Sequence, residues 1–282
     1  YPTGYMTNIG VISALAGKQD TIFSDELNHA SIVEACKLSG AKIKVFKHNN
    51  MKDFERKIQK TNGKKFVVTE GIFSMDGDWS KLDEMTEISE KKDIITILDD
   101  AHGDFVLGRD GRGTANFFNV EKKIDLYISS LSKGLGSFGG YVCGKSNLID
   151  LCINTSKTFI YTSALPASIN QYSLQRFNSN REAYRRKLWN KINQFHDRLN
   201  EIGFKTTSTS QIIPIIIGDE KKAMDFSKFL KNEGIFAQAI RYPTVKKNQA
   251  RIRISITGWL SEKEIEYSIK ILEKAKRKFH LK

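Results

Sequence analysis

The sequence predicts an α/β fold in which a mainly parallel sheet is covered by helices, with a smaller α+β domain after it. Short runs rich in Val, Ile and Phe alternate with helical stretches, which is typical of parallel sheets. Within these runs consecutive positions are apolar, as strands covered on both faces require. After Gly203 a separate group of strand-like and helical segments follows, which indicates a second domain.

The predicted elements follow a regular order along the chain. In its first part the expected strands are Thr21–Asp25, Lys42–Phe46, Phe66–Gly71, Ile94–Asp99, Leu126–Leu131, Tyr141–Gly144 and Phe159–Ser163. From Pro166 to about Leu199 the pattern is helical without a turn signal, so a connecting helix is expected. In the last part the expected strands are Ile212–Ile217, Phe236–Ile240 and Ile252–Thr257, and the expected helices are Glu220–Asn232 and Ser261–Lys278. The predicted domains are therefore a large domain (1–170), the connecting helix (171–202) and a small C-terminal domain (203–282).

Composition and charge exclude several classes of protein. The 282 residues contain no apolar run near the roughly 18 residues of a membrane span and no signal-peptide pattern at the start. The chain begins Tyr1-Pro-Thr-Gly without Met, so we expect a fragment that lacks an N-terminal segment. Three cysteines without CxxC spacing predict neither a disulfide framework nor a metal site, and favour a reducing, cytoplasmic location. The net charge of +13 is spread over helical stretches, which favours solvated helix faces over a nucleic-acid interface.

One lysine stands out because of the loop that carries it. Lys133 follows the expected strand Leu126–Leu131 and opens a segment with four glycines within seven residues, ending at Gly140. A surface lysine in a flexible loop is the ordinary explanation for any single lysine. However, a lysine between a strand and a glycine-rich turn also suits a buried amine that forms a Schiff base with a flat, phosphorylated ligand.

Polar groups also follow three other expected strands. Asp99 ends one strand and His102 comes three residues later, His29 lies where a helix begins, and Ser74 follows a third strand. A buried carboxylate at a strand end is costly unless it meets a cation or a metal. Because parallel strands end at one edge of a sheet, these groups and Lys133 are expected to gather there.

This set of residues suits catalysis with pyridoxal 5'-phosphate (PLP). The cofactor requires a lysine for its aldehyde, here Lys133, and an anion opposite its ring nitrogen, here Asp99. Its phosphate requires amides and hydroxyls. The backbone amides of Gly4 and Tyr5 at the start of the first helix, together with Ser130, are the candidates.

Seven short motifs occur in a fixed order along the chain. They are Leu27-Asn-His-Ala-Ser31, Glu70-Gly-Ile-Phe-Ser-Met-Asp-Gly77, Asp99-Asp-Ala-His-Gly103, Gly111-Arg-Gly113, Ser130-Leu-Ser-Lys-Gly134, Phe159-Ile-Tyr-Thr-Ser-Ala-Leu-Pro166 and Ile240-Arg-Tyr-Pro-Thr-Val245. With these motifs the chain resembles the α-oxoamine synthases, which are PLP-dependent acyltransferases of fold type I. The resemblance extends from Gly4 to the C-terminal helix.

The resemblance implies a role for each site residue. Lys133 would carry the Schiff base and move the α-proton of the amino-acid substrate, and Asp99 would pair with the ring nitrogen. His29 would stack on the ring and lie beside the substrate, and Ser74 and His102 would hold the phenolic oxygen. The phosphate would be bound by Ser130, Gly4 and Tyr5, and by Thr162 and Ser163 of a neighbouring subunit, so a homodimer with shared active sites is implied. Arg253 would bind the substrate carboxylate, with Thr244 near the substrate.

Within this family, the motifs at 159–166 and 240–245 favour a member that condenses L-alanine with a pimeloyl thioester, on CoA or a carrier protein. The alternative is a member that joins glycine to acetyl-CoA. Two departures from the family pattern stand out. The segment that usually precedes the equivalent of Gly4 is missing, which bears on activity, and Asp104-Phe105 replaces small residues after His102.

A competing motif points to a different class of enzyme. Residues 139–146, Gly-Gly-Tyr-Val-Cys-Gly-Lys-Ser, fit the P-loop pattern G-x-x-x-x-G-K-[ST] of NTPases. A P-loop must follow a strand, whereas Tyr141–Cys143 within this pattern is itself strand-like. A further alternative is a protein that keeps the fold but has no catalytic activity. Against it argues the joint presence of four site residues, Lys133, Asp99, His29 and His102.

Overall fold

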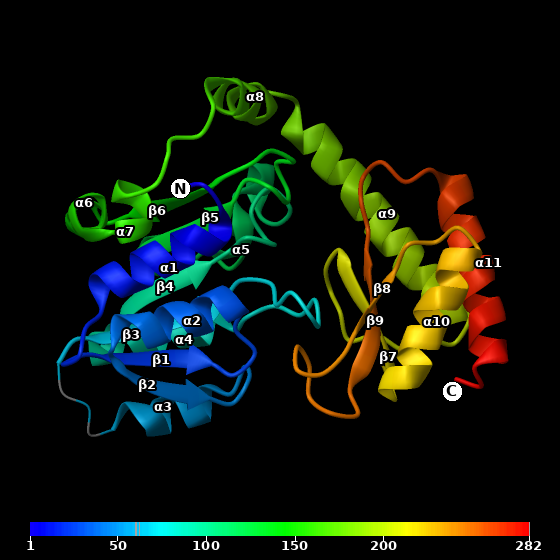
Figure 1. Cartoon of the computed structure of the whole chain (residues 1–282), viewed down its shortest axis with the longest axis horizontal. Coiled ribbons are helices and arrows are strands. Elements are labelled where there is room, and N and C mark those ends of the chain that lie inside the picture. Colours follow the sequence, from blue (N-terminus) through cyan, green and yellow to red (C-terminus); the bar gives the residue numbers. More distant parts are fainter. Residues whose placement is uncertain (60, 62, 282) are drawn as a thin grey trace. The chain divides into compact units, whose positions relative to one another are not determined.

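The computed structural model describes residues 1–59, 61 and 63–281 and divides into two compact units (Figure 1). The first unit contains Tyr1–Phe73 and Trp79–Glu182, and the second contains Ser74–Asp78 and Ala183–Lys282. In the described part of the chain, no helix has both the length and the apolar character needed to cross a membrane. The three domains expected from the sequence (1–170, 171–202 and 203–282) stay predictions.

The first unit is built on a six-stranded sheet. Its strands are β1 (Thr21–Asp25), β2 (Lys42–Phe46), β3 (Lys65–Glu70), β4 (Ile95–Asp99), β5 (Leu126–Ser130) and β6 (Gly140–Gly144). They lie in the order β2-β1-β3-β4-β5-β6, and all neighbours are parallel except β5 and β6, which are antiparallel. The prediction of a mainly parallel sheet is therefore confirmed, and these six strands end within one residue of the expected positions.

Helices connect the strands, and most of them pack against the sheet. They are α1 (Gly4–Leu15), α2 (Ala30–Ser39), α3 (Met51–Ile58), α4 (Leu82–Lys92), α5 (Gly113–Phe117), α6 (Ser146–Thr155), α7 (Lys157–Ile160) and α8 (Ala167–Phe177), with short 3-10 turns at Arg109–Gly111 and Glu121–Lys123. Capping residues explain several starts. Thr3 accepts a hydrogen bond from the Met6 amide before α1, and Asn50 accepts one from the Asp53 amide before α3.

Alternate residues of the strands enter two separate cores. On one face, Ile22, Val68 and Ile97 pack with the apolar residues of α1 and α2. On the other face, Phe23 and Leu98 pack with residues of α3, α4 and α5. The central strands β1, β3, β4 and β5 are buried at nearly every position, as the sequence indicated, whereas the edge strand β2 is exposed at Lys42, Ile43 and Val45.

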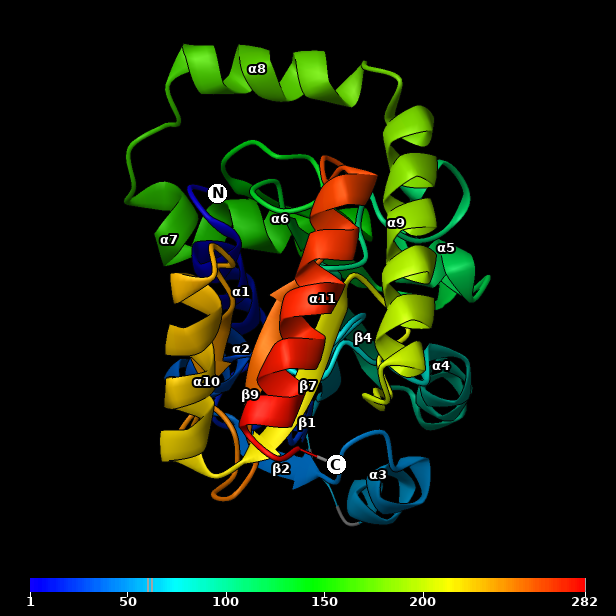
Figure 2. The same ribbon diagram turned by 90° about the vertical axis from the view of Figure 1, so that its right-hand side faces the viewer.

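The second unit contains a small antiparallel sheet and three helices. Its strands are β7 (Ile212–Gly218), β8 (Gln238–Ile240) and β9 (Ala250–Ser255), in the order β7-β9-β8. Its helices are α9 (Arg181–Glu201), which belongs to this unit from Ala183 on, α10 (Glu220–Asn232) and α11 (Glu262–Lys278). Figure 2 shows α10 and α11 in front of β7 and β9. Ile192, Phe226, Ile252 and Ile269 are among the residues that form the core between helices and sheet. The start of α11 is fixed by a reciprocal pair of hydrogen bonds between Ser261 and Glu264.

Two expectations from the sequence are wrong. The expected strand Phe159–Ser163 is instead the end of α7, because the Phe159 and Ile160 amides bond back to the Ser156 carbonyl, and the residues that follow are exposed. The expected single helix from Pro166 to Leu199 is two helices, α8 and α9. The break lies at Asn178-Ser-Asn180, where the Ser179 hydroxyl bonds to the Arg176 carbonyl, and such residues favour turns over helix interiors.

Candidate functional site

Four neighbouring strands of the first unit end at the same edge of the sheet. β1, β3, β4 and β5 are parallel and adjacent (Figure 1), so the chain leaves each of them on the same side. His29 follows β1 at the start of α2, Asp99 is the last residue of β4, and His102 lies in the turn after it. Lys133 follows β5.

The Lys133 amine lies beside an imidazole. The distance between Lys133 Nζ and His102 Nε2 is 2.8 Å. Lys133 is exposed rather than buried, as are its neighbours Ser132 and Gly134. The turn closes by a hydrogen bond from the Gly136 amide to the Lys133 carbonyl, and Gly136 has a φ of +70°, which favours glycine.

The Asp99 carboxylate is buried and held by two donors. Asp99 is only 6% exposed; its Oδ2 accepts a hydrogen bond from Asn8 Nδ2 at 2.6 Å and its Oδ1 accepts one from the Ala101 amide at 3.0 Å. Asn8 also donates to Ser31 Oγ at 2.9 Å, and Ser31 Oγ lies 2.7 Å from His29 Nδ1. These donors offset part of the cost of burying a carboxylate, and they connect α1, α2 and β4.

The N-terminus of α1 lies against the end of β5. A Cβ on Gly4 would lie 2.7 Å from Ser130 Cβ, and a Cβ on Gly140 would lie 2.8 Å from the Gly4 amide nitrogen. The Gly4 amide and the Ser130 hydroxyl are therefore neighbours, at a helix end where backbone amides favour anions. The Tyr5 ring meets the His29 ring edge-on, with centroids 6.4 Å apart.

The remaining predicted residues lie elsewhere. Ser74 and Arg253 belong to the second unit, where Arg253 Nη1 donates to the Ser74 carbonyl at 3.1 Å and burial lowers the pKa of the Arg253 guanidinium. Thr244 is exposed in the turn before β9, and Thr162 and Ser163 are exposed between α7 and α8. Phe105, which departs from the family pattern, faces Phe177, with ring centroids 6.4 Å apart.

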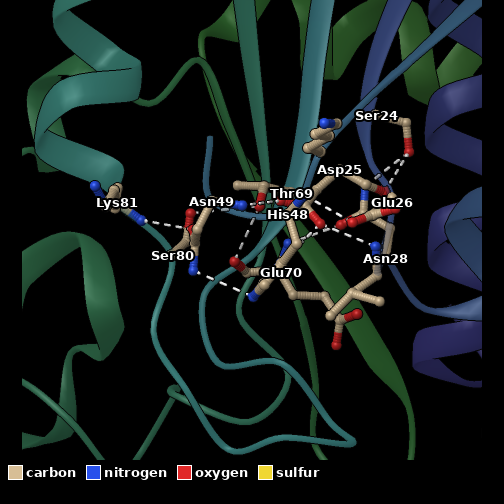
Figure 3. Close-up of polar contacts among 12 residues, drawn as sticks. Ser24, Asp25, Glu26, Asn28, His48, Asn49, Thr69, Glu70, Ser80 and Lys81 are labelled. Atoms are coloured by element: carbon tan, nitrogen blue, oxygen red, sulfur yellow. Dashed lines mark hydrogen bonds and ion pairs between the residues drawn. The ribbon is translucent and has the colours of Figure 1, made fainter. Parts of the chain in front are cut away.

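Sequence reasoning missed a polar network beside this edge (Figure 3). Asp25 at the end of β1 is buried, and its carboxylate accepts from the Leu27 amide, the Asn49 amide and His48 Nδ1, each at 2.9 Å. Asn49, with a φ of +50°, donates from Nδ2 to the Trp79 carbonyl at 2.9 Å and accepts from the Lys81 amide at 3.2 Å. The network therefore fixes the loop after β2 to the segment before α4.

The P-loop pattern does not form a P-loop. Residues 140–144 are strand β6, which pairs with β5, so the backbone amides of this segment belong to a sheet rather than to a phosphate-binding loop. Lys145 Nζ lies 2.5 Å from Asp125 Oδ1 and forms an ion pair with it. This arrangement gives no support to an NTPase.

Comparison with known proteins identifies the relatives of this chain. Residues 1–272 match the family described as aminotransferase class I and II. An 8-amino-7-oxononanoate synthase of Thermoanaerobacter pseudethanolicus is 42% identical over 287 residues, which cover 100% of this chain and 73% of that protein.

Solved structures are similar over the whole chain. A variant of serine palmitoyltransferase from S. paucimobilis with a bound PLP–myriocin aldimine has a TM-score of 0.96 at 27% identity, covering 100% of this chain and 73% of that one. The 8-amino-7-oxononanoate synthase of Francisella tularensis has a TM-score of 0.85 at 30% identity, covering 100% and 82%.

Replacement of Asn49 tests the network around Asp25. We expect Asn49→Ala to lower the free energy of unfolding by about 1–3 kcal/mol, because it removes the side-chain hydrogen bonds to His48, Trp79 and Lys81 and places Ala at a positive φ. Asn49→Gly removes the same bonds without the backbone penalty, so it should cost less. Urea denaturation of both variants measures this difference. Equal stability of Asn49→Ala and the unmodified protein would contradict the account.

Proposed function

Because the chain belongs to the aminotransferase class I and II family and, within it, to the α-oxoamine synthases, we propose that it is an 8-amino-7-oxononanoate synthase. In the proposed reaction, L-alanine condenses with a pimeloyl thioester, on CoA or a carrier protein, and CO2 and the thiol are released. The product belongs to biotin biosynthesis. The relative from Thermoanaerobacter pseudethanolicus, at 42% identity over the whole chain, supports this reaction over the glycine and acetyl-CoA alternative.

The observation that carries the proposal is the position of the Lys133 amine, 2.8 Å from His102 Nε2, one strand away from the buried Asp99. These residues fit PLP, since the cofactor requires an amine, an anion for its ring nitrogen and donors for its phosphate. The close approach of Gly4 to Ser130, which leaves no room for a Cβ, provides amides and a hydroxyl at the start of α1. When bound, PLP supplies an electron-withdrawing ring that stabilises negative charge on the α-carbon of the amino acid.

The protein's own groups would hold and move protons around that ring. Asp99, fixed by Asn8 and the Ala101 amide, would keep the proton on the ring nitrogen. Lys133 Nζ would take the α-proton of the amino acid, and the His102 imidazole beside it would orient the amine and hold the phenolic oxygen. Because the donors to Asp99 are already in place, no rearrangement is needed to stabilise its charge.

The other assignments follow the family pattern. Gly4, Tyr5 and Ser130 would bind the phosphate, His29 would stack on the ring, and Ser74 would hold the phenolic oxygen. Arg253 would bind the carboxylate of L-alanine near Thr244, which suits a half-buried guanidinium.

A homodimer with shared active sites belongs to the same proposal. Thr162 and Ser163, which are exposed in the loop between α7 and α8, would reach the phosphate in the partner subunit.

The three cysteines Cys36, Cys143 and Cys152 are unpaired, which supports the proposed cytoplasmic location.

Covalent labelling tests the assignment of Lys133. Incubation with PLP should give a visible absorption band, and borohydride should abolish the band and leave the label on Lys133, as peptide mass spectrometry would show. Lys133→Ala should give no reducible band, whereas Lys145→Ala, the matched control, should keep it. A label on another lysine would contradict the proposal, and ATP hydrolysis that depends on Lys145 would favour the P-loop alternative.

Thiol release tests the substrates. Each of L-alanine and glycine is combined with pimeloyl-CoA and acetyl-CoA, and the free thiol is followed over time. We expect kcat/KM for L-alanine with pimeloyl-CoA to exceed that for glycine with acetyl-CoA by at least about 10-fold, since a pocket that fits a longer chain gains contacts in the transition state. A preference for glycine with acetyl-CoA would refute the proposed reaction while leaving the role of Lys133 intact.

A further inference from the structure

Asp100 is a fully buried carboxyl group that the proposed chemistry does not use. It follows Asp99 directly, but its side chain contacts different elements. Its Oδ2 accepts hydrogen bonds from the Thr114 amide at 2.6 Å and from the Tyr127 hydroxyl at 2.8 Å, on α5 and β5. The two consecutive carboxyl groups therefore have separate surroundings, and only Asp99 is held by α1.

The second oxygen of Asp100 lies near the Thr114 hydroxyl. Among the described residues, neither Asp100 Oδ1 nor Thr114 Oγ1 has a hydrogen-bond partner in good geometry, although both are buried. Both atoms lie within 2.3 Å of the place that a Cβ on Gly71 would take, so they are close neighbours. The Thr114 hydroxyl can therefore bond to Oδ1 in either form, accepting from a protonated Asp100 or donating to an ionised one.

Burial and a like charge favour this protonated form. Burial and, to a smaller extent, the nearby Asp104 raise the pKa of Asp100 to about 7, against the opposing hydrogen bonds from the Thr114 amide and hydroxyl and the Tyr127 hydroxyl. Burial also raises the pKa of Asp104 and of Tyr127 and Tyr141, whose hydroxyls face the two carboxyl groups, and the pKa of Cys143 next to them. No basic side chain is among the causes that act on Asp100.

The backbone of three glycines packs closely against the Asp100 side chain. A Cβ on Gly71 or on Gly103 would lie 2.1 Å from Oδ1, and a Cβ on Gly113 would lie 2.2 Å from Oδ2. These glycines come from the loop after β3, the turn after β4 and the start of α5. The carboxyl group therefore occupies the point where three backbone segments meet, and each segment approaches too closely to tolerate a side chain of its own.

The backbone of Asp100 connects these segments to the turn that carries His102. The Asp100 amide donates to the Ile128 carbonyl at 2.8 Å, and the Gly103 amide donates to the Asp100 carbonyl at 3.0 Å. This turn carries His102, whose Nε2 lies 2.8 Å from Lys133 Nζ. We propose that Asp100 is a positioning residue, whose buried side chain fixes the turn that holds Asp99 and His102 in place, and that it acts in its neutral form. The effect on the cofactor rests on the proposed function, whereas the effect on the fold does not.

Thermal unfolding without cofactor tests the neutral form. Because the pKa of folded Asp100 lies above its ordinary value of 3.8, an unfolded chain ionises first as the pH rises, and the stability contributed by Asp100 falls between about pH 4 and pH 7. Asp100→Asn is neutral at every pH. The difference in Tm between this variant and the unmodified protein should therefore grow in favour of the variant from about pH 5 to pH 7.5.

Asp110→Asn is the matched control, since Asp110 is an exposed aspartate of the following loop. Its difference in Tm from the unmodified protein should not change with pH. A constant difference for Asp100→Asn as well would refute the neutral form of Asp100.

Cofactor affinity tests the positioning role. We expect Asp100→Ala to weaken PLP binding by at least about 10-fold and Asp100→Asn by clearly less, because the amide oxygen still accepts from Thr114 and Tyr127. In Asp100→Ala kcat should fall, while KM for L-alanine changes by less than about threefold, since Arg253 is untouched. Unchanged PLP affinity and kcat in Asp100→Ala would overturn the proposal.

Tyr127→Phe decides the question if Asp100→Ala fails to fold. Loss of the hydroxyl should weaken PLP binding by about threefold, and unchanged binding would count against Asp100 as a positioning residue. If the unmodified protein binds no PLP, the proposed function fails, but the pH dependence of the Tm difference still decides whether Asp100 is neutral in the fold.

Discussion

The buried carboxylate of Asp99 is the constraint on which the rest of the first unit depends. A carboxylate that is 6% exposed requires donors, and the chain provides them from α1, through Asn8, and from the following turn, through the Ala101 amide. Placing those donors requires α1 to lie across the end of β4. The same placement brings the N-terminus of α1 to Ser130 at the end of β5. One electrostatic requirement therefore accounts for the positions of a helix, a turn and two strand ends.

The two consecutive aspartates divide two tasks between them. Asp99 keeps donors suited to an anion, whereas Asp100 has the close backbone approach of three glycines and a raised pKa, which suit a neutral group. These opposite environments suit different roles for the two carboxyl groups. The charged Asp99 would pair with a cofactor, and the neutral Asp100 would hold neighbouring backbone segments together. The proposed chemistry depends on the first and the geometry of the turn depends on the second.

The sequence predicted the strands and the residues that follow them, because apolar runs and polar strand ends are local signals. It did not predict Asn8, because an asparagine within a helix gives no sign that it faces a carboxylate far along the chain. His48 and Asn49 were missed because they lie in a loop whose partners, Asp25 and Trp79, come from other segments. The β-branched and aromatic residues of Phe159–Ser163 favour a strand, but the Phe159 and Ile160 amides bond locally to the Ser156 carbonyl.

We propose that the buried carboxylate of Asp99 holds a proton on the ring nitrogen of PLP. NMR of the protein loaded with PLP that carries ¹⁵N in the ring measures that proton directly. At neutral pH we expect the ¹⁵N shift of a protonated pyridinium in the unmodified protein and that of an unprotonated pyridine in Asp99→Asn. The same protonated shift in both proteins, or an unprotonated ring in the unmodified one, would contradict the account.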